Sequence, residues 1–244
     1  MFRTNGLLIS ISVFFLFCFI SCQKSDSATN PTPTPTPLAA TDTVTDIEGN
    51  TYKTVKIGNQ WWMAENLRTT KYRNGDPISN VSDNAAWAAL ITPAYCWYQN
   101  SKATYGTVYG ALYNWYAVDA ASNGNRSICP AGWHIPSEAE WTTLTTSLGG
   151  LSVAGGKMKE TGTSHWSAPN TGATNASGFT ALPGGYRGYI TGEFGNIGSF
   201  GHWWSSTQAD AALAWGEGLF TLDNPADHST SVKKNGFSIR CVKD

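Results

Sequence analysis

The sequence predicts one mixed domain of short β-strands, one or two short helices and long loops. Residues 52–57 are rich in β-favouring side chains and lie between turn pairs at 49–50 and 58–59, which predicts an N-terminal hairpin. A capped helical pattern begins at Ser137. From residue 151 to the C-terminus, glycine, asparagine, serine and threonine recur every few residues without helical periodicity. We therefore expect loops and short strands in this half.

The predicted helix after Pro136 has a complete set of end signals. Ser137 is the expected N-cap, and Glu140 lies three residues further on, as a capping box requires. One apolar face follows at helical spacing: Trp141, Leu144 and Leu148. The glycine pair at 149–150 should end this helix. A second, shorter helix is expected over residues 83–90, with an aspartate as its cap.

The charge balance excludes one class of partner. The chain has 16 Lys and Arg against 17 Asp and Glu, and the basic residues are scattered singly or in pairs. A nucleic-acid site needs clustered basic side chains, because release of counterions from phosphates drives such binding. We therefore expect no nucleic-acid partner. Aromatic residues make up 13% of the chain, and we expect seven tryptophans to fill the core: Trp61, Trp62, Trp115, Trp133, Trp141, Trp203 and Trp204.

The N-terminus is typical of an export signal. Arg3 precedes an apolar run of about 15 residues, which is shorter than the ~20 needed to cross a bilayer. Ser21 and Cys22 resemble the end of the lipobox of bacterial lipoproteins, so we expect a signal peptide at 1–21 and acylation of Cys22. The alternative is an ordinary secretory signal with a chance cysteine. Acylation would bind the protein to the membrane through a lipid anchor.

Residues 22–44 are predicted to form a tether, followed by one domain at 45–244. Four Thr/Pro alternations end at Pro37, and such a segment is extended and semi-rigid. The residues directly after Cys22, QKSD, resemble the export signals that send lipoproteins of the Bacteroidetes type to the cell surface. We therefore expect an outer-membrane lipoprotein that is exposed at the surface.

Motifs for nucleotide, zinc or serine-hydrolase chemistry are absent from the sequence. The four histidines are far apart and have no paired ligand spacing, and no Gly-x-Ser-x-Gly elbow occurs. Four carboxylates gather in the loop-rich half and are candidates for calcium: Asp210, Glu217, Asp223 and Asp227. A solvated loop is the preferred interpretation of these residues. We therefore expect no cofactor and leave calcium open.

Three cysteines follow the expected lipidation site: Cys96, Cys129 and Cys241. In an oxidising compartment two of them can pair, and one is then left over. The residues alone do not choose among the three pairings.

An ordered set of motifs resembles the Fibrobacter succinogenes major paralogous domain, a family of bacterial surface lipoproteins whose biochemical role is largely undefined. The segments are 109–118 (YGALYNWYAV), 129–141 (CPAGWHIPSEAEW), 155–162 (GGKMKETG), 181–187 (ALPGGYR), 203–207 (WWSST) and 236–241 (GFSIRC). The resemblance covers residues 45–244.

Segments 135–141 and 236–241 are also similar, more distantly, to formylglycine-generating (sulfatase-modifying) enzymes. This resemblance implies an α+β, C-type-lectin-like fold with short twisted antiparallel strands and long irregular loops. It also implies a disulfide between Cys129 and Cys241. Formylglycine formation needs two redox cysteines in the C-terminal half, and no cysteine lies between these two positions. The calcium and sugar motif of C-type lectins is absent as well, which puts calcium-dependent sugar binding in doubt.

The leading functional hypothesis is a non-enzymatic, lectin-like module that binds an extracellular glycan or protein, with a role in adhesion left open. Six residues are candidates for ligand contact: Tyr186, Arg187, Tyr189, Glu193, Phe194 and Asp223. One alternative is a structural subunit of the envelope or of a fimbria-like assembly, which an unpaired strand edge would favour. The other is a hydrolase, which a pair of neighbouring carboxylates with raised pKa among the four calcium candidates would favour.

Overall fold

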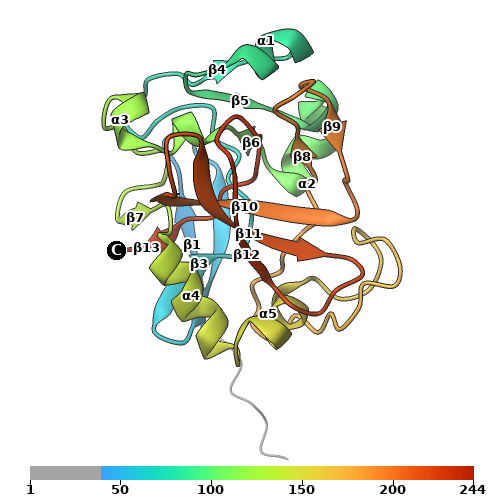
Figure 1. The fold of residues 1–244 in the computed structure, drawn as a ribbon. Helices are drawn as coiled ribbons and strands as arrows, with labels where there is room; N and C mark the ends of the chain where they lie inside the picture. Colours follow the sequence, from blue (N-terminus) through green and yellow to red (C-terminus); the bar gives the residue numbers. More distant parts are fainter. Residues whose placement is uncertain (1–39) are drawn as a thin grey trace, which may run out of the picture. The chain divides into compact units, whose positions relative to one another are not determined.

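The computed structural model describes residues 40–244, and its largest sheet has five strands (Figure 1). Their order is β1-β2-β3-β13-β7, and all neighbours are antiparallel. The bounds are β1 (Thr41–Thr45), β2 (Thr51–Ile57), β3 (Gln60–Met63), β7 (Trp133–His134) and β13 (Val242–Lys243). β2 and β3 form the expected hairpin. β1 begins inside the segment that we expected to be a tether.

The expected signal peptide at 1–21, the lipidation site Cys22 and most of the tether lie outside the described residues. Within residues 40–244 no helix is long and apolar enough to cross a membrane.

A second sheet has the order β10-β11-β12 and is antiparallel throughout. Its strands are β10 (Phe200–Gln208), β11 (Leu213–Phe220) and β12 (Asp227–Val232). The expectation of short strands was wrong for β10 and β11, which have nine and eight residues. β11 has glycine, and so no side chain, at positions 216 and 218. A Cβ on Gly216 would lie 2.8 Å from the Trp203 carbonyl oxygen, so the strand needs glycine there.

Two small sheets complete the strand content. The first joins β4 (Ser79–Asn80), β5 (Ala94–Cys96) and β6 (Leu112–Tyr113), and the second pairs β8 (Tyr186–Arg187) with β9 (Phe194–Gly195). Single bridges connect β8 to its surroundings: Gly185 pairs with Gly201, and Arg187 pairs with Gly236. β8 therefore lies next to the start of β10.

Both predicted helices are confirmed. α1 (Asn84–Ala89) has Asp83 as its N-cap, and α4 (Glu138–Ser147) begins with a complete capping box between Ser137 and Glu140. The shorter helical segments are η1 (Tyr98–Asn100), the π-helix η2 (Lys102–Gly106), α2 (Thr107–Tyr109), η3 (Trp115–Ala117) and α3 (Ala120–Asn123). In Figure 1, α1 lies at one end of the domain and α4 at the other.

One further helix, α5 (Leu151–Met158), contradicts the expectation of loops and strands after residue 151. Its sequence contains Gly155 and Gly156, which weaken a helix by about 1 kcal/mol each relative to alanine. These glycines let the helix approach the loop at 224–225. A Cβ on Gly155 would lie 2.5 Å from the Pro225 carbonyl oxygen. Tertiary packing therefore outweighs the weak local preference.

The core is built from aromatic side chains in two large clusters. One cluster lies against α4 and contains Trp62, Trp141, Phe179 and Trp203, with ring centroids of neighbouring pairs 4.7–6.1 Å apart. The other cluster contains, among others, Trp115, Trp133 and Trp204. Six of the seven expected core tryptophans are buried, and Trp61 is partly buried. Burial of these aromatic side chains therefore contributes much of the stability of a domain whose helices and strands are mostly short.

The disulfide between Cys129 and Cys241 is confirmed, with a sequence separation of 112 residues. Cys241 precedes β13, and Cys129 lies shortly before β7, so the bridge ties two neighbouring strands of the five-stranded sheet. Cys96 is buried and is not in a disulfide. The structure therefore agrees with an α+β domain whose C-terminus is covalently fixed.

Candidate functional site

A pocket of about 520 Å³ opens between the β8–β9 hairpin, the start of β10 and the segment after β12. This volume is in the range of sites for small organic ligands, roughly 300–1,000 Å³. The pocket is lined by Tyr186, Gly188, Tyr189, Ile190, Thr191, Glu193, Phe194, Phe200, His202, Ser231, Asn235 and Phe237. Its lining thus combines aromatic rings with a few hydroxyl and amide groups.

His202 is the centre of the aromatic lining. Its ring stacks on Phe237, with centroids 4.7 Å apart and an angle of 15° between the planes. Tyr186 and Phe200 meet the same imidazole edge-on, with centroids 6.2 and 5.9 Å away. Phe200 and His202 are two residues apart on β10, so their side chains are on the same face of the strand. The strand period therefore brings both rings to the pocket.

The His202 imidazole is neutral and has free hydrogen-bonding capacity. Burial lowers the pKa of His202 to about 4. Within residues 40–244, neither ring nitrogen forms a hydrogen bond with another residue, whereas the imidazoles of His134, His165 and His228 all do. A neutral imidazole has one donor and one acceptor. His202 can therefore give one hydrogen bond to a ligand and accept another.

The tip of the β8–β9 hairpin forms the rim of the pocket. Tyr189 and Ile190 are exposed there, by 40% and 73%. The Gly188 amide donates to the Glu193 carbonyl at 2.8 Å, and the Tyr189 amide donates to Asn235 Oδ1 at 3.1 Å. The rim thus presents apolar side chains on a backbone that is fixed by hydrogen bonds.

Arg187 does not line this pocket, although we expected it to contact ligand. Its side chain is buried, and it donates to the carbonyl oxygens of Gly192, Val81 and Ser82 and to Asn84 Oδ1, at 2.5–3.0 Å. The guanidinium carbon lies 4.7 Å from the centroid of the Phe194 ring. Arg187 therefore joins the hairpin tip to the start of α1 and supports the pocket from behind.

Of the other five residues that we expected to contact ligand, four line the pocket and one does not. Tyr186, Tyr189, Glu193 and Phe194 line the pocket together. Asp223 is exposed in the turn after β11, where its carbonyl oxygen accepts a hydrogen bond from Lys159 Nζ, and it lies outside the pocket.

Sequence reasoning missed several lining residues: Phe200, His202, Ser231, Asn235 and Phe237. Phe200 and His202 could have been found from the sequence, because residues two positions apart on a strand point to the same side.

The four carboxylates considered for calcium do not gather. Asp210 accepts hydrogen bonds from the Ala212 and Leu213 amides, each at 2.7 Å, in the turn between β10 and β11. Asp227 is exposed and accepts a bond from Ser229. In the part of the chain that the structure describes, no group of three or more His, Cys, Asp and Glu side chains is placed to hold a metal ion.

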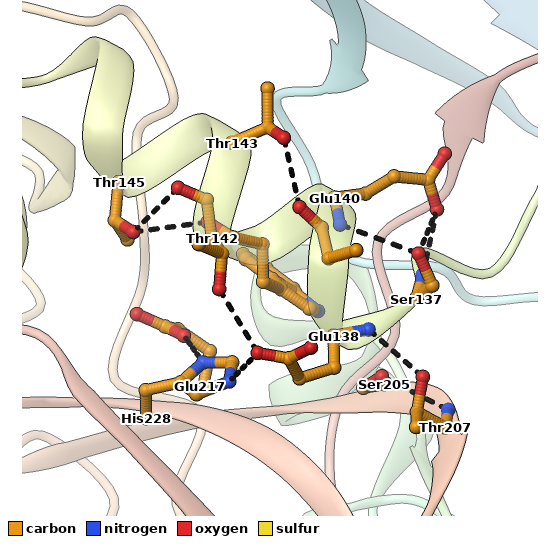
Figure 2. A network of polar contacts seen from close by, with 12 residues as sticks. Ser137, Glu138, Glu140, Thr142, Thr143, Thr145, Ser205, Thr207, Glu217 and His228 are labelled. Carbon is orange, nitrogen blue, oxygen red and sulfur yellow. Dashed lines mark hydrogen bonds and ion pairs between the residues drawn. The ribbon is translucent and has the colours of Figure 1, made fainter.

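Glu217 differs from the other three because it is buried in a polar network beneath α4. Figure 2 shows His228 between Glu217 of β11 and Glu138 of α4. His228 Nδ1 lies 2.9 Å from Glu217 Oε2, and Nε2 lies 3.1 Å from Glu138 Oε1. Trp215 stacks on His228, with centroids 5.1 Å apart. The second carboxyl oxygen of Glu217 is buried without a hydrogen-bond partner among the described residues.

Both inner members of this network have raised pKa values. Burial raises the pKa of Glu217 to about 7, although His228 opposes the shift and Asp227 adds to it. The hydrogen bond with Glu217 raises the pKa of His228, and burial opposes this shift. Between pH 4.5 and 7 the folded protein therefore binds more protons than the unfolded chain, so stability falls as pH rises.

We expect the free energy of unfolding to be lower at pH 8 than at pH 5.5, and urea denaturation at the two values measures this difference. The Glu217→Gln variant should show a smaller difference, because it removes the carboxyl whose pKa is raised by burial and also the partner that raises the pKa of His228. His134, held between Asp244 and Glu140, also has a raised pKa and remains in this variant as an internal reference. If Glu217→Gln kept the full pH dependence of the parent chain, the network would not be its source.

These features define a class: an α+β domain with a disulfide-tied C-terminal strand and an aromatic pocket. The family model of the Fibrobacter succinogenes major domain matches residues 55–243, and the chain belongs to this family. None of the curated proteins and none of the solved structures matches the chain.

Proposed function

We propose that this protein is a non-enzymatic binding module of a surface-anchored outer-membrane lipoprotein. Its aromatic pocket binds a glycan or a protein segment on a lectin-like scaffold, in a role such as adhesion. The observation that carries the proposal is the neutral imidazole of His202, which lies among aromatic rings and has no hydrogen-bond partner in residues 40–244. Aromatic faces pack against the apolar faces of sugar rings, and the imidazole matches hydroxyl groups.

We propose that the ligand binds without a metal ion, because the lining of the pocket offers few oxygen ligands for one. Glu193 is its single carboxylate, and a calcium ion takes six to eight oxygen ligands. Hydrolysis is less well supported, because it needs two carboxylates in one cleft. Glu217 is the candidate carboxylate with a clearly raised pKa, and its side chain is fully buried in the network beneath α4 and does not line the pocket.

The test is a glycan-array and polysaccharide screen of the full chain in detergent solution, with calcium and again with EDTA. We expect binding in both buffers and a loss of about tenfold in affinity for Tyr189→Ala, which removes an exposed ring at the rim. The matched control is Leu222→Ala, which removes another exposed apolar side chain outside the pocket. An equal loss in both variants, or no binding to any glycan, would contradict glycan recognition by this pocket.

One observation favours an assembly role as a second candidate. β12 is at the edge of its sheet, and no strand of the described residues pairs with its outer side. An open edge is a site for strand addition by another chain. If no glycan binds, sedimentation of the full chain would test this alternative, and self-association that depends on residues of β12 would support it.

A further inference from the structure

Among the residues that the structure describes, no side chain that lines the pocket is positively charged at neutral pH. Glu193 is the only lining residue with a formal charge at neutral pH, since His202 is neutral. Arg187 lies behind the wall of the pocket, and its guanidinium donates to oxygen atoms of Gly192 and of the segment 81–84. The Phe194 ring lies against this guanidinium and lines the pocket itself.

Lys233 and Lys234 directly precede the lining residue Asn235, and their ammonium groups bind carbonyl oxygen atoms outside the pocket. Lys233 Nζ donates to the carbonyl oxygens of Asp210 and Ala211 at 2.8 and 3.1 Å, and it lies 4.5 Å from the Trp115 ring centroid. Lys234 Nζ donates to the Ala88 carbonyl at 3.2 Å. Both ammonium groups are therefore engaged by backbone oxygen atoms, although Asn235 directly beyond them lines the pocket.

An anionic ligand would meet one carboxylate in this pocket and no cationic side chain from the described part of the chain. A buried or half-buried anion without a partner is costly, and like charges placed together at an interface oppose binding. An uncharged ligand with hydroxyl groups has no such cost. It finds hydroxyl groups on Tyr186, Tyr189 and Ser231, an amide on Asn235 and the imidazole of His202.

We propose that this pocket binds uncharged glycans more tightly than acidic ones. Glu193 repels anionic ligands, and His202 forms hydrogen bonds with the hydroxyl groups of the sugar. The inference rests on the proposed function and adds the chemical class of the ligand. It assigns Glu193 and His202 different parts in specificity: one acts by charge, and the other acts by hydrogen bonds.

His202 suits this role because its ring stacks on Phe237 in the lining of the pocket and its nitrogen atoms form no hydrogen bond with another described residue. Phenylalanine at this position keeps a ring that can stack and removes the donor and the acceptor. A weakened affinity in His202→Phe would thus report the lost hydrogen bonds. Unfolding by urea, followed in parallel, shows whether the variant is folded.

The experiment measures the affinity of the full chain for pairs of oligosaccharides that differ only in charge, at low ionic strength. Suitable pairs are gluco-oligosaccharides against oligoglucuronates and galacto-oligosaccharides against oligogalacturonates. We expect the neutral member of a pair to bind at least about tenfold more tightly. Glu193→Gln should raise the affinity for the acidic member and narrow the ratio to about threefold, whereas His202→Phe should weaken binding of the neutral member about tenfold.

The control variant is Asp42→Asn, which removes an exposed carboxylate on β1, outside the pocket, and should leave the ratio unchanged. Equal binding of neutral and acidic members by the parent chain would overturn the inference and leave the proposed function standing. An unchanged ratio in Glu193→Gln would overturn the role of Glu193, and an unchanged affinity in His202→Phe would overturn that of His202. Failure of every glycan to bind would overturn both the inference and glycan recognition.

Discussion

Replacing Cys129 and Cys241 together by alanine should lower the free energy of unfolding by about 4 to 5 kcal/mol. The bridge closes a loop of more than a hundred residues, and the entropy that it removes from the unfolded chain grows with loop length. The folded state also depends on it. β13 has two residues, and it contacts its neighbours through Val242 opposite Trp62 and His134 and through Lys243 opposite Trp133.

Urea denaturation of the parent chain with and without a thiol reductant measures this effect. Reductant should lower the stability of the parent chain to that of the double variant, and it should leave the double variant unchanged. Each single alanine variant should lose about as much as the double variant, because one missing partner already breaks the bridge. A reductant effect below about 1 kcal/mol on the parent chain would contradict the expectation.

Arg240→Met should destabilise the fold by about 3 to 5 kcal/mol, because it removes a fully buried cation from a set of oxygen acceptors. Arg240 Nε donates to Asn66 Oδ1 at 2.8 Å, and the two terminal nitrogen atoms donate to the carbonyl oxygens of Phe179 and Thr180. The guanidinium carbon also lies 4.2 Å from the Phe179 ring centroid. Burial lowers the pKa of Arg240 to about 9, so the side chain stays charged at neutral pH.

The matched control is Arg73→Met, which replaces an exposed arginine that has no side-chain hydrogen bond within the described residues. We expect a change within about 0.5 kcal/mol for this control. Arg240→Lys should give an intermediate loss, because an ammonium keeps the charge and cannot reproduce the planar fork of donors. Thermal and urea unfolding of the three variants would measure the series. A loss below about 1 kcal/mol in Arg240→Met would contradict the assignment.

The elements that the sequence predicts well are those whose cause is local. The capping box of Ser137 and Glu140 lies within four residues, and both ends of α4 follow from it and from the glycine pair. The disulfide was predicted through a family resemblance, because geometry over 112 residues cannot be deduced from the spacing of three cysteines. The family assignment itself is supported by the match over residues 55–243.

The elements that were missed have non-local causes. The glycines of α5 appear unfavourable for a helix until the backbone at 224–225 is seen against them. Arg187 follows a pair of glycines and an exposed tyrosine follows soon after, so it was expected on the surface. Its guanidinium instead binds backbone oxygen atoms about a hundred positions earlier in the chain. Four pocket residues were expected from an exposed-loop pattern, and His202 was missed because its partners, Phe237 and Tyr186, are distant in sequence.

The position of β13 has a consequence for the order in which the fold is completed. β1, β2 and β3 follow one another closely in the sequence, so they can pair without the rest of the domain. Among the described residues, β7 joins this sheet only through β13, which lies far beyond it in the sequence. The bridge between Cys129 and Cys241 needs the same long-range approach. The sheet is therefore closed only when residues 241–243 reach it, and a variant that is truncated before β13 would lack the strand that connects β3 to β7.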